Sequence, residues 1–196
     1  EDRNGNLILN PEREIRLSQQ SKGDAVQVIP RETAFVMTKL LEQTVQSGTL
    51  WRQKWKFNYK TEDGKEYTMP MAGKTGTTQN WADAWTSGFS PYYTSTFWFG
   101  FDRPGRSLGL KITGATLAGF AWGDYMREIH QNLIAKDFPQ PIEGVIKATV
   151  CSESGGIPTP ACEGHLTTQW YLQGTQPTEI CHIHSSNSSS VLSISR

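Results

Sequence analysis

The chain lacks several features that would assign it quickly to a class of protein. Its 19 basic and 19 acidic residues leave no net charge, which argues against a nucleic-acid binder. No segment approaches the 18 consecutive apolar residues typical of a membrane helix. The sequence also contains no Ser-x-x-Lys, so the serine-lysine pair of one large group of acyl-transfer enzymes is missing from it.

The most informative stretch that is present runs from Met71 to Thr78 and contains Gly73-Lys74-Thr75-Gly76. A nucleotide-binding phosphate loop would need a glycine at position 68, where the chain has Thr68, so the stretch does not match that motif. A strand-like pattern leads into the stretch, and two aromatic-rich strand patterns follow it. We therefore expect Lys74 on a strand.

Further short motifs lie before and after this stretch in the sequence. The stretches concerned are Ile29–Ala34, Ala72–Thr78, Asp83-Ala84-Trp85, Gly88–Pro91, Trp98–Asp102, Gly174–Thr178 and Cys181-x-x-His184. Together they resemble the class A, bifunctional penicillin-binding proteins over residues 2–184, with Lys-Thr-Gly as the third active-site motif. The chain departs from the family in a longer link at residues 50–70 and in Gly119-Phe120, where a proline is common.

The resemblance implies a fold and an organisation for the chain. The fold is expected to be α+β, as the C-terminal part of a transpeptidase domain related to serine β-lactamases, with helices flanking an antiparallel sheet. Residues 1–137 would complete that domain, residues 138–184 would form an irregular cysteine-containing tail, and the serine-rich residues 185–196 would be disordered. Ser185-Ser186-Asn187 matches Ser-x-Asn only by accident on this view.

The resemblance also implies a role for each residue of the motif. Lys74 would place its charge beside the nucleophile and the substrate carboxylate, and the hydroxyls of Thr75 and Thr77 would bind that carboxylate. Gly76 would leave room for an extended peptide, and the amide of Thr77 would donate to the oxyanion. Lys74 and Thr77 are the expected catalytic residues, and no cofactor or metal is expected to take part.

The family's activity suggests what a longer parent protein would do. The parent would cross-link peptidoglycan stem peptides at D-Ala-D-Ala through a serine outside this chain, would bind β-lactams, and would carry an N-terminal glycosyltransferase domain. It would lie on the periplasmic face of the bacterial membrane through an anchor that is absent here. The alternatives are a non-catalytic truncated fragment or cell-wall binding module, and a β-lactamase.

The local patterns predict the individual elements. Strands are expected at residues 6–9, 25–29, 73–78, 84–90, 94–101 and 145–150, and helices at residues 30–47 and 116–136. A hairpin is expected from residue 55 to residue 69, turning at Asp63-Gly64, as a surface excursion or as a gate over the cleft. The apolar positions Ala34, Met37, Leu41 and Val45 predict one buried stripe on the first helix.

Three cysteines and three of the four histidines fall in the tail. An extracytoplasmic setting permits a disulfide, and Cys151 and Cys162 would close the shorter loop and leave one spare thiol. Three thiolates and one imidazole can also hold zinc, and three free thiols are the remaining possibility. His130, on the second expected helix, is expected at the surface.

Overall fold

The computed structural model describes residues 11–22, 27–61, 63–103 and 105–184. The elements in chain order are α1 (Pro11–Lys22), α2 (Arg31–Gln46), η2 (Trp51–Phe57), β1 (Asn58–Lys60), β2 (Glu66–Thr68), β3 (Ala72–Thr77), η3 (Gln79–Trp81), β4 (Ala84–Phe89), β5 (Thr94–Phe99), η4 (Gly114–Ala118), α3 (Gly119–Ile129), β6 (Val145–Cys151), η5 (Pro160–Cys162) and β7 (Leu166–Leu172). None of the described helices combines the length and the hydropathy that a membrane crossing requires.

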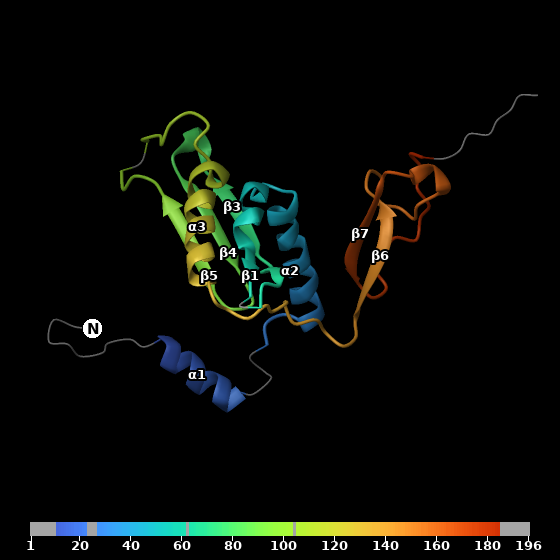
Figure 1. The fold of residues 1–196 in the computed structure, drawn as a ribbon, viewed down its shortest axis with the longest axis horizontal. Coiled ribbons are helices and arrows are strands. Elements are labelled where there is room, and N and C mark those ends of the chain that lie inside the picture. The colour runs from blue at the N-terminus through green and yellow to red at the C-terminus, as the bar shows by residue number, and fades with distance from the viewer. Residues whose placement is uncertain (1–10, 23–26, 62, 104, 185–196) are drawn as a thin grey trace, which may run out of the picture.

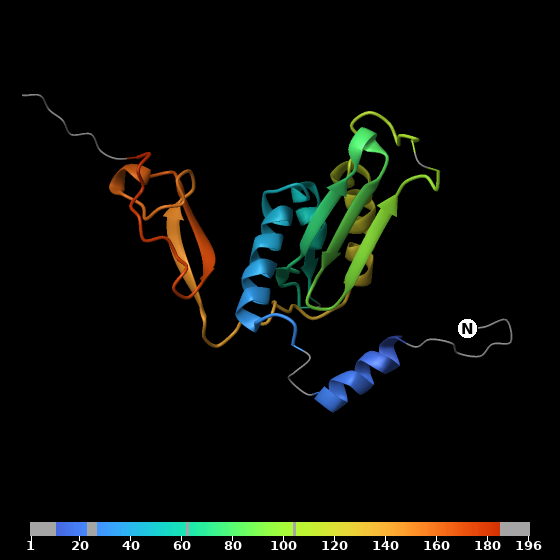
Figure 2. The same ribbon diagram turned by 180° about the vertical axis from the view of Figure 1, so that it is seen from behind.

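Three antiparallel strands form the central sheet, in the order β3-β4-β5 (Figure 1). Paired residues of antiparallel strands lie on the same face of a sheet, so the register assigns each side chain to a face. One face carries Gly73, Gly88 and Thr86, and it packs against α3. The opposite face, which Figure 2 turns toward the viewer, carries the aligned set Lys74, Gly76, Trp85, Ser87, Thr96 and Trp98.

The core lies between the sheet, α3 and the segment that links α2 to β3. Its buried members are Val45, Leu50, Phe57, Met69, Met71, Trp122 and Met126. Trp122 is fully buried, and its ring approaches Gly88 so closely that a Cβ there would lie 2.3 Å from it. Gly88 therefore allows the sheet and α3 to approach each other.

Helix α2 runs beside β3 at the edge of the sheet. The Thr44 hydroxyl donates to the Gly73 carbonyl at 2.8 Å, which ties the helix to the strand. The helix begins after Pro30 and ends at Ser47-Gly48, as the sequence predicts. The predicted buried stripe is only partly correct, because Met37 is 52% exposed while Phe35 is buried against Trp170 of β7.

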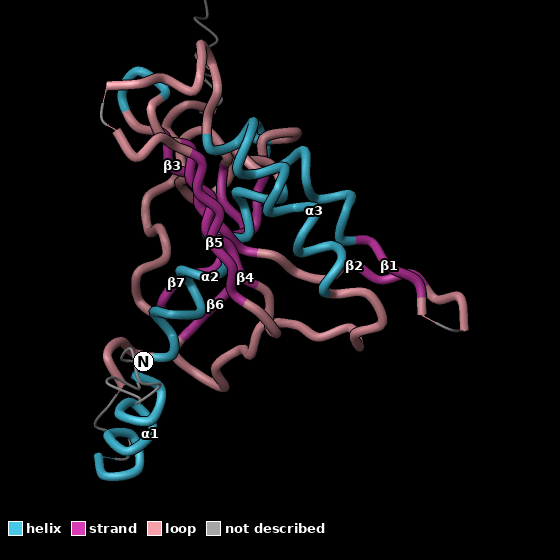
Figure 3. The backbone as a smooth tube through the Cα atoms, turned by 90° about the vertical axis from the view of Figure 1, so that its left-hand side faces the viewer, coloured by secondary structure: helices cyan, strands magenta, loops and turns pink. Residues whose placement is uncertain are grey.

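The predicted hairpin forms, but it is shorter than expected. Residues 51–57 are a 3-10 helix, and only Asn58–Lys60 pairs with Glu66–Thr68. The hydroxyl of Tyr59 donates to the Arg127 carbonyl, and Tyr67 donates to Leu133, so the hairpin lies against the end of α3 (Figure 3). It is therefore on the side of the sheet opposite Lys74.

Other expected elements differ from the structure. The strand predicted at residues 6–9 lies outside the described residues, and residues 27–29 are not a strand. Helix α1 was not predicted. The second expected helix ends at Ile129, with His130 as its C-cap, rather than near residue 136, and Asn132 just beyond it has a left-handed backbone with φ of 65°. The disorder predicted for residues 185–196 also lies outside the described residues.

Candidate functional site

The Lys74 motif forms strand β3, which is an edge strand of the sheet in the described part of the chain. Lys74 is exposed on the face opposite α3, and its ammonium group donates to the Thr75 carbonyl at 2.7 Å. On the same face the Ser87 and Thr96 hydroxyls lie 2.8 Å apart. A cation and two hydroxyls thus share an open polar strip across the strands.

Gly76 lies further along the same face, opposite Trp85 of β4. A Cβ at Gly76 would lie 3.3 Å from the Trp85 Cβ, so only a small residue leaves this part of the strand open. Trp85 and Trp98 contact each other with ring centroids 5.8 Å apart, and they are 42% and 43% exposed. The exposed face therefore combines the Lys74 charge with an apolar patch.

The hydroxyls of Thr75 and Thr77 are already engaged on the other face of the strand. Thr75 Oγ1 lies 3.0 Å from Thr49 Oγ1, and Thr77 Oγ1 accepts from the Gly114 amide at 2.9 Å. A hydroxyl that accepts one bond keeps its own proton to donate. Gly114 fits because a Cβ there would lie 2.2 Å from the Trp85 carbonyl oxygen.

The turn after β3 is held by Asp83. Its carboxylate accepts from the Thr78 hydroxyl at 2.8 Å and from the Trp98 indole N–H at 2.9 Å. Asn80 and Trp81 in this turn have positive φ angles of 56° and 51°, a conformation that needs such support. Asp83 therefore connects the end of the motif strand to β5.

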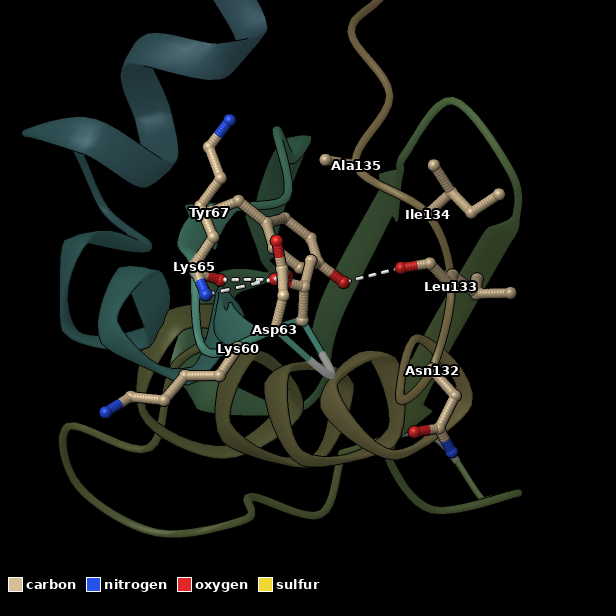
Figure 4. Close-up of a pocket in the computed structure, with 9 residues that line it drawn as sticks. Lys60, Asp63, Lys65, Tyr67, Asn132, Leu133, Ile134 and Ala135 are labelled. Carbon is tan, nitrogen blue, oxygen red and sulfur yellow. Dashed lines mark hydrogen bonds between the residues drawn. The ribbon is translucent and has the colours of Figure 1, made fainter.

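Two pockets lie away from this face, and neither is lined by a residue of β3. One, of about 600 Å³, lies between the β1–β2 hairpin and residues 132–135, where Tyr67 reaches the Leu133 carbonyl (Figure 4). The other, of about 750 Å³, lies between the start of α2 and residues 138–143. Neither pocket is lined by a cysteine or a histidine.

A second group of reactive side chains lies in the tail, and we call it the sulfur cluster: Cys151, Cys162, Cys181 and His184. The three cysteines are buried and are free thiols, so the expected Cys151–Cys162 disulfide is not formed. A hydrogen bond from the Ser154 side chain is the largest cause that lowers the pKa of Cys181, to about 6. Burial is the largest influence on Cys162, and it raises the pKa of that thiol.

The expectation of a surface position for His130 is wrong. The side chain is fully buried, with Nδ1 2.6 Å from the Met126 carbonyl and Nε2 2.6 Å from the Ser90 hydroxyl. Ser90 also accepts from the amides of Tyr92 and Tyr93 at 3.0 and 3.1 Å. A neutral imidazole that donates from Nδ1 and accepts at Nε2 satisfies this network.

Burial lowers the pKa of His130 below its ordinary value of 6.5. Since protonation costs more in the folded state than in the unfolded state, the free energy of unfolding should be greatest above about pH 6.5 and should fall as the pH drops below it. Urea unfolding between pH 8 and pH 5 should show this fall, and His130→Gln should flatten it. An identical pH dependence in the variant would contradict the assignment.

Comparison with known proteins finds one matching family and several similar proteins. The family described as "Penicillin-binding protein 1A, C-terminal domain" matches residues 141–186. Penicillin-binding protein 1A of Clostridium tetani is 33% identical over 93% of this chain and 21% of its own length, and that of Clostridium perfringens is 27% identical over 93% of this chain and 20% of its own.

The crystal structure of penicillin-binding protein 1A from Haemophilus influenzae is also similar. It shares 26% identity and a TM-score of 0.62 over 79% of this chain and 22% of that one. The chain thus spans about a fifth of the length of the relatives it matches. Its mixed helices and antiparallel sheet agree with the expected α+β class. The chain is therefore similar to penicillin-binding protein 1A, and its tail matches the C-terminal domain of that family.

Proposed function

We propose that β3 is the substrate-binding strand of a serine D-Ala-D-Ala transpeptidase, and that the nucleophile belongs to a part of the longer protein outside residues 1–196. The observation that carries this proposal is Lys74 on the open face of an edge strand, in a chain related to penicillin-binding proteins. The exposed Trp85–Trp98 patch on that face supports it, because tryptophans on one sheet face are a typical surface for another part of a protein to cover.

The backbone of β3 supports a role in binding an extended peptide. Residues 73 and 75 direct their carbonyls to side chains, Thr44 and Lys74, rather than to β4. Backbone groups of alternate residues in an edge strand share a direction, so the amide of Thr77 points the same way. An edge amide of this kind is free to donate to the substrate carbonyl oxygen as negative charge develops there.

The side chains then divide the remaining work. The Lys74 ammonium group neutralises the terminal carboxylate of the stem peptide and supports proton transfer near the nucleophile. The Thr77 hydroxyl accepts from the Gly114 amide and still has its proton to donate to that carboxylate. The Thr75 hydroxyl, 3.0 Å from Thr49 Oγ1, is the second proposed contact of the carboxylate. These three side chains need no metal or organic cofactor.

The proposed reaction is acyl transfer through a serine ester. The serine oxygen attacks the carbonyl carbon of the D-Ala-D-Ala bond, the C–N bond breaks, and D-alanine leaves with a proton on its nitrogen. An amine from a neighbouring stem peptide then attacks the ester and restores the serine. In the carboxypeptidase side reaction, water attacks the ester instead. β-Lactams would acylate the same serine. The longer protein would lie on the periplasmic side of the membrane and would carry a glycosyltransferase domain.

A non-catalytic role is the second candidate, because no Ser-x-x-Lys occurs in residues 1–196. On this hypothesis the chain would act as a binding module or a truncated product. A β-lactamase is less well supported, since the family match extends through the cysteine-containing tail.

Labelling with a fluorescent penicillin separates these functions. The longer natural protein should become covalently labelled, and peptide mapping should place the adduct on a serine outside residues 1–196. The 196-residue chain alone should stay unlabelled at the same concentration. An adduct on any serine within residues 1–196, or no labelling of the longer protein, would contradict the proposal.

A further inference from the structure

The sulfur cluster brings together residues from three separate segments of the tail. Cys151 ends β6, Cys162 ends η5, and Cys181 and His184 lie on one turn near the end of the described chain. Their four donor atoms, three Sγ and one ring nitrogen, all lie within 4.8 Å of one another. Cys151 and His184 are 33 residues apart in the sequence. The pairing of β6 with β7 does not by itself bring these two residues together.

The distances suit one tetrahedral ion. With Zn–S bonds of about 2.3 Å and a Zn–N bond of about 2.0 Å, tetrahedral angles place sulfur and nitrogen about 3.5 Å apart. His184 Nδ1 lies 3.3 Å from Cys151 Sγ and 3.5 Å from Cys181 Sγ. Soft thiolate ligands with one imidazole, in a tetrahedral arrangement, favour zinc over calcium or magnesium.

Hydrogen bonds around the cluster also suit a metal site. The amides of Thr159 and His184 donate to Cys162 Sγ and Cys181 Sγ, each at 3.3 Å, and would stabilise negative charge on sulfur. The other nitrogen of His184, Nε2, lies 3.5 Å from the Glu153 carboxylate. A carboxylate on the second ring nitrogen is the usual partner of a metal-bound histidine.

The tail has only a small hydrophobic core. Between residues 145 and 184, the buried hydrophobic residues are Val150 and the three cysteines. Modules of this size, about 40 residues, usually need a metal or disulfides in place of a large core. We propose that Cys151, Cys162, Cys181 and His184 bind one zinc ion, which has a structural role in joining β6, η5 and the end of the tail.

The geometry favours zinc over the expected disulfide for a specific reason. A Cys151–Cys162 disulfide would involve only two of the four donor residues. It would not explain why Cys181 and His184 lie beside them. A closed site with four protein ligands leaves no position for water or substrate, so the ion stabilises the fold and takes no part in acyl transfer. The inference does not depend on the proposed function.

Metal titration of the 196-residue chain tests this proposal. The chain is first reduced and freed of metal, and Zn²⁺ is then added while native mass spectrometry and thiol reactivity are followed. We expect one zinc per chain and protection of all three thiols at one equivalent. Co²⁺ in place of zinc should give the strong near-ultraviolet absorption of thiolate-to-cobalt charge transfer.

Two histidines of the same turn provide a matched comparison. His184→Ala should weaken zinc binding by more than the 10–100-fold typical of changes around a metal site, whereas exposed His182→Ala should stay within about twofold. Glu153→Gln keeps all four ligands and should weaken zinc binding by about 10–100-fold. This variant tests the site if His184→Ala fails to fold. Absence of zinc uptake, thiols that stay reactive with zinc present, or equal losses at His182 and His184 would each overturn the proposal.

Discussion

Replacement of Lys74 by alanine in the longer natural protein should slow acylation by penicillin about a hundredfold while leaving the fold intact. The ammonium group lies on the open face of an edge strand, and among the described residues it donates to the Thr75 carbonyl of its own strand. Loss of a preorganised charge or donor at a developing charge typically costs about 3 kcal/mol in the barrier. Loss of an exposed lysine costs about 0.5 kcal/mol of stability or less.

A second exposed lysine provides the control. Lys60 on the β1–β2 hairpin has a side chain that is 70% exposed, and it forms an ion pair with Glu66 across the hairpin. Lys60→Ala should leave the acylation rate constant within about twofold of the parent, which corresponds to about 0.4 kcal/mol. If Lys74→Ala behaved like Lys60→Ala, the assignment of β3 to the active site would be wrong.

Replacement of Trp122 by alanine should lower the free energy of unfolding by about 3–5 kcal/mol. The ring is fully buried, contacts Phe57 edge to face at 5.5 Å, and fills the space above Gly88. A cavity at this position lies between α3 and the central strand β4, so the remaining side chains cannot close it without moving the sheet. Chemical denaturation of the 196-residue chain, followed by circular dichroism, measures the loss.

Phenylalanine at the same position separates packing from hydrogen bonding. The Trp122 indole N–H has no hydrogen-bond partner among the described residues, so its removal breaks no bond. Trp122→Phe should therefore cost clearly less than Trp122→Ala, since the ring is retained in part. Equal losses in the two variants would show that the core is not organised around this ring.

The central sheet could be predicted because its signals are local. Strands β3, β4 and β5 and helix α2 lie within one or two residues of their predicted bounds, since each alternates or repeats with a clear period and ends at glycine, proline or aspartate. The family resemblance also predicts that the strand with Lys74 is followed by two more strands, which are β4 and β5. The roles of Lys74, Thr75, Gly76 and Thr77 in catalysis remain predictions.

The errors arise where tertiary contacts decide. The hairpin is expected to start at residue 55, yet residues 51–57 form a 3-10 helix in which Gln53 and Phe57 are buried. His130 is the C-cap of α3, and Ser90, Tyr92 and Tyr93 from the β4–β5 turn contact its ring. Neither contact has a signal in the local sequence.

The tail shows the same limit in its chemistry. The irregular spacing of Cys151, Cys162 and Cys181 matches no known zinc-binding motif. The sequence therefore favours a disulfide, and the Cys151–Cys162 pair would close the shorter loop. The isolated bridge between Ile157 and Ile180 brings the last segment back alongside the first, and this contact places His184 beside the sulfur atoms. Only a long-range pairing of that kind distinguishes a metal site from a disulfide.

The most direct test of the central claim is the crystal structure of the longer natural protein acylated by a penicillin. The account predicts the β-lactam carboxylate within hydrogen-bond distance, about 2.5–3.2 Å, of the Thr75 or Thr77 hydroxyl, with its acyl carbonyl oxygen accepting from the Thr77 amide. The Lys74 ammonium group should lie beside the acylated serine. An acyl group whose carboxylate and carbonyl oxygen contact no residue of β3 would contradict the account.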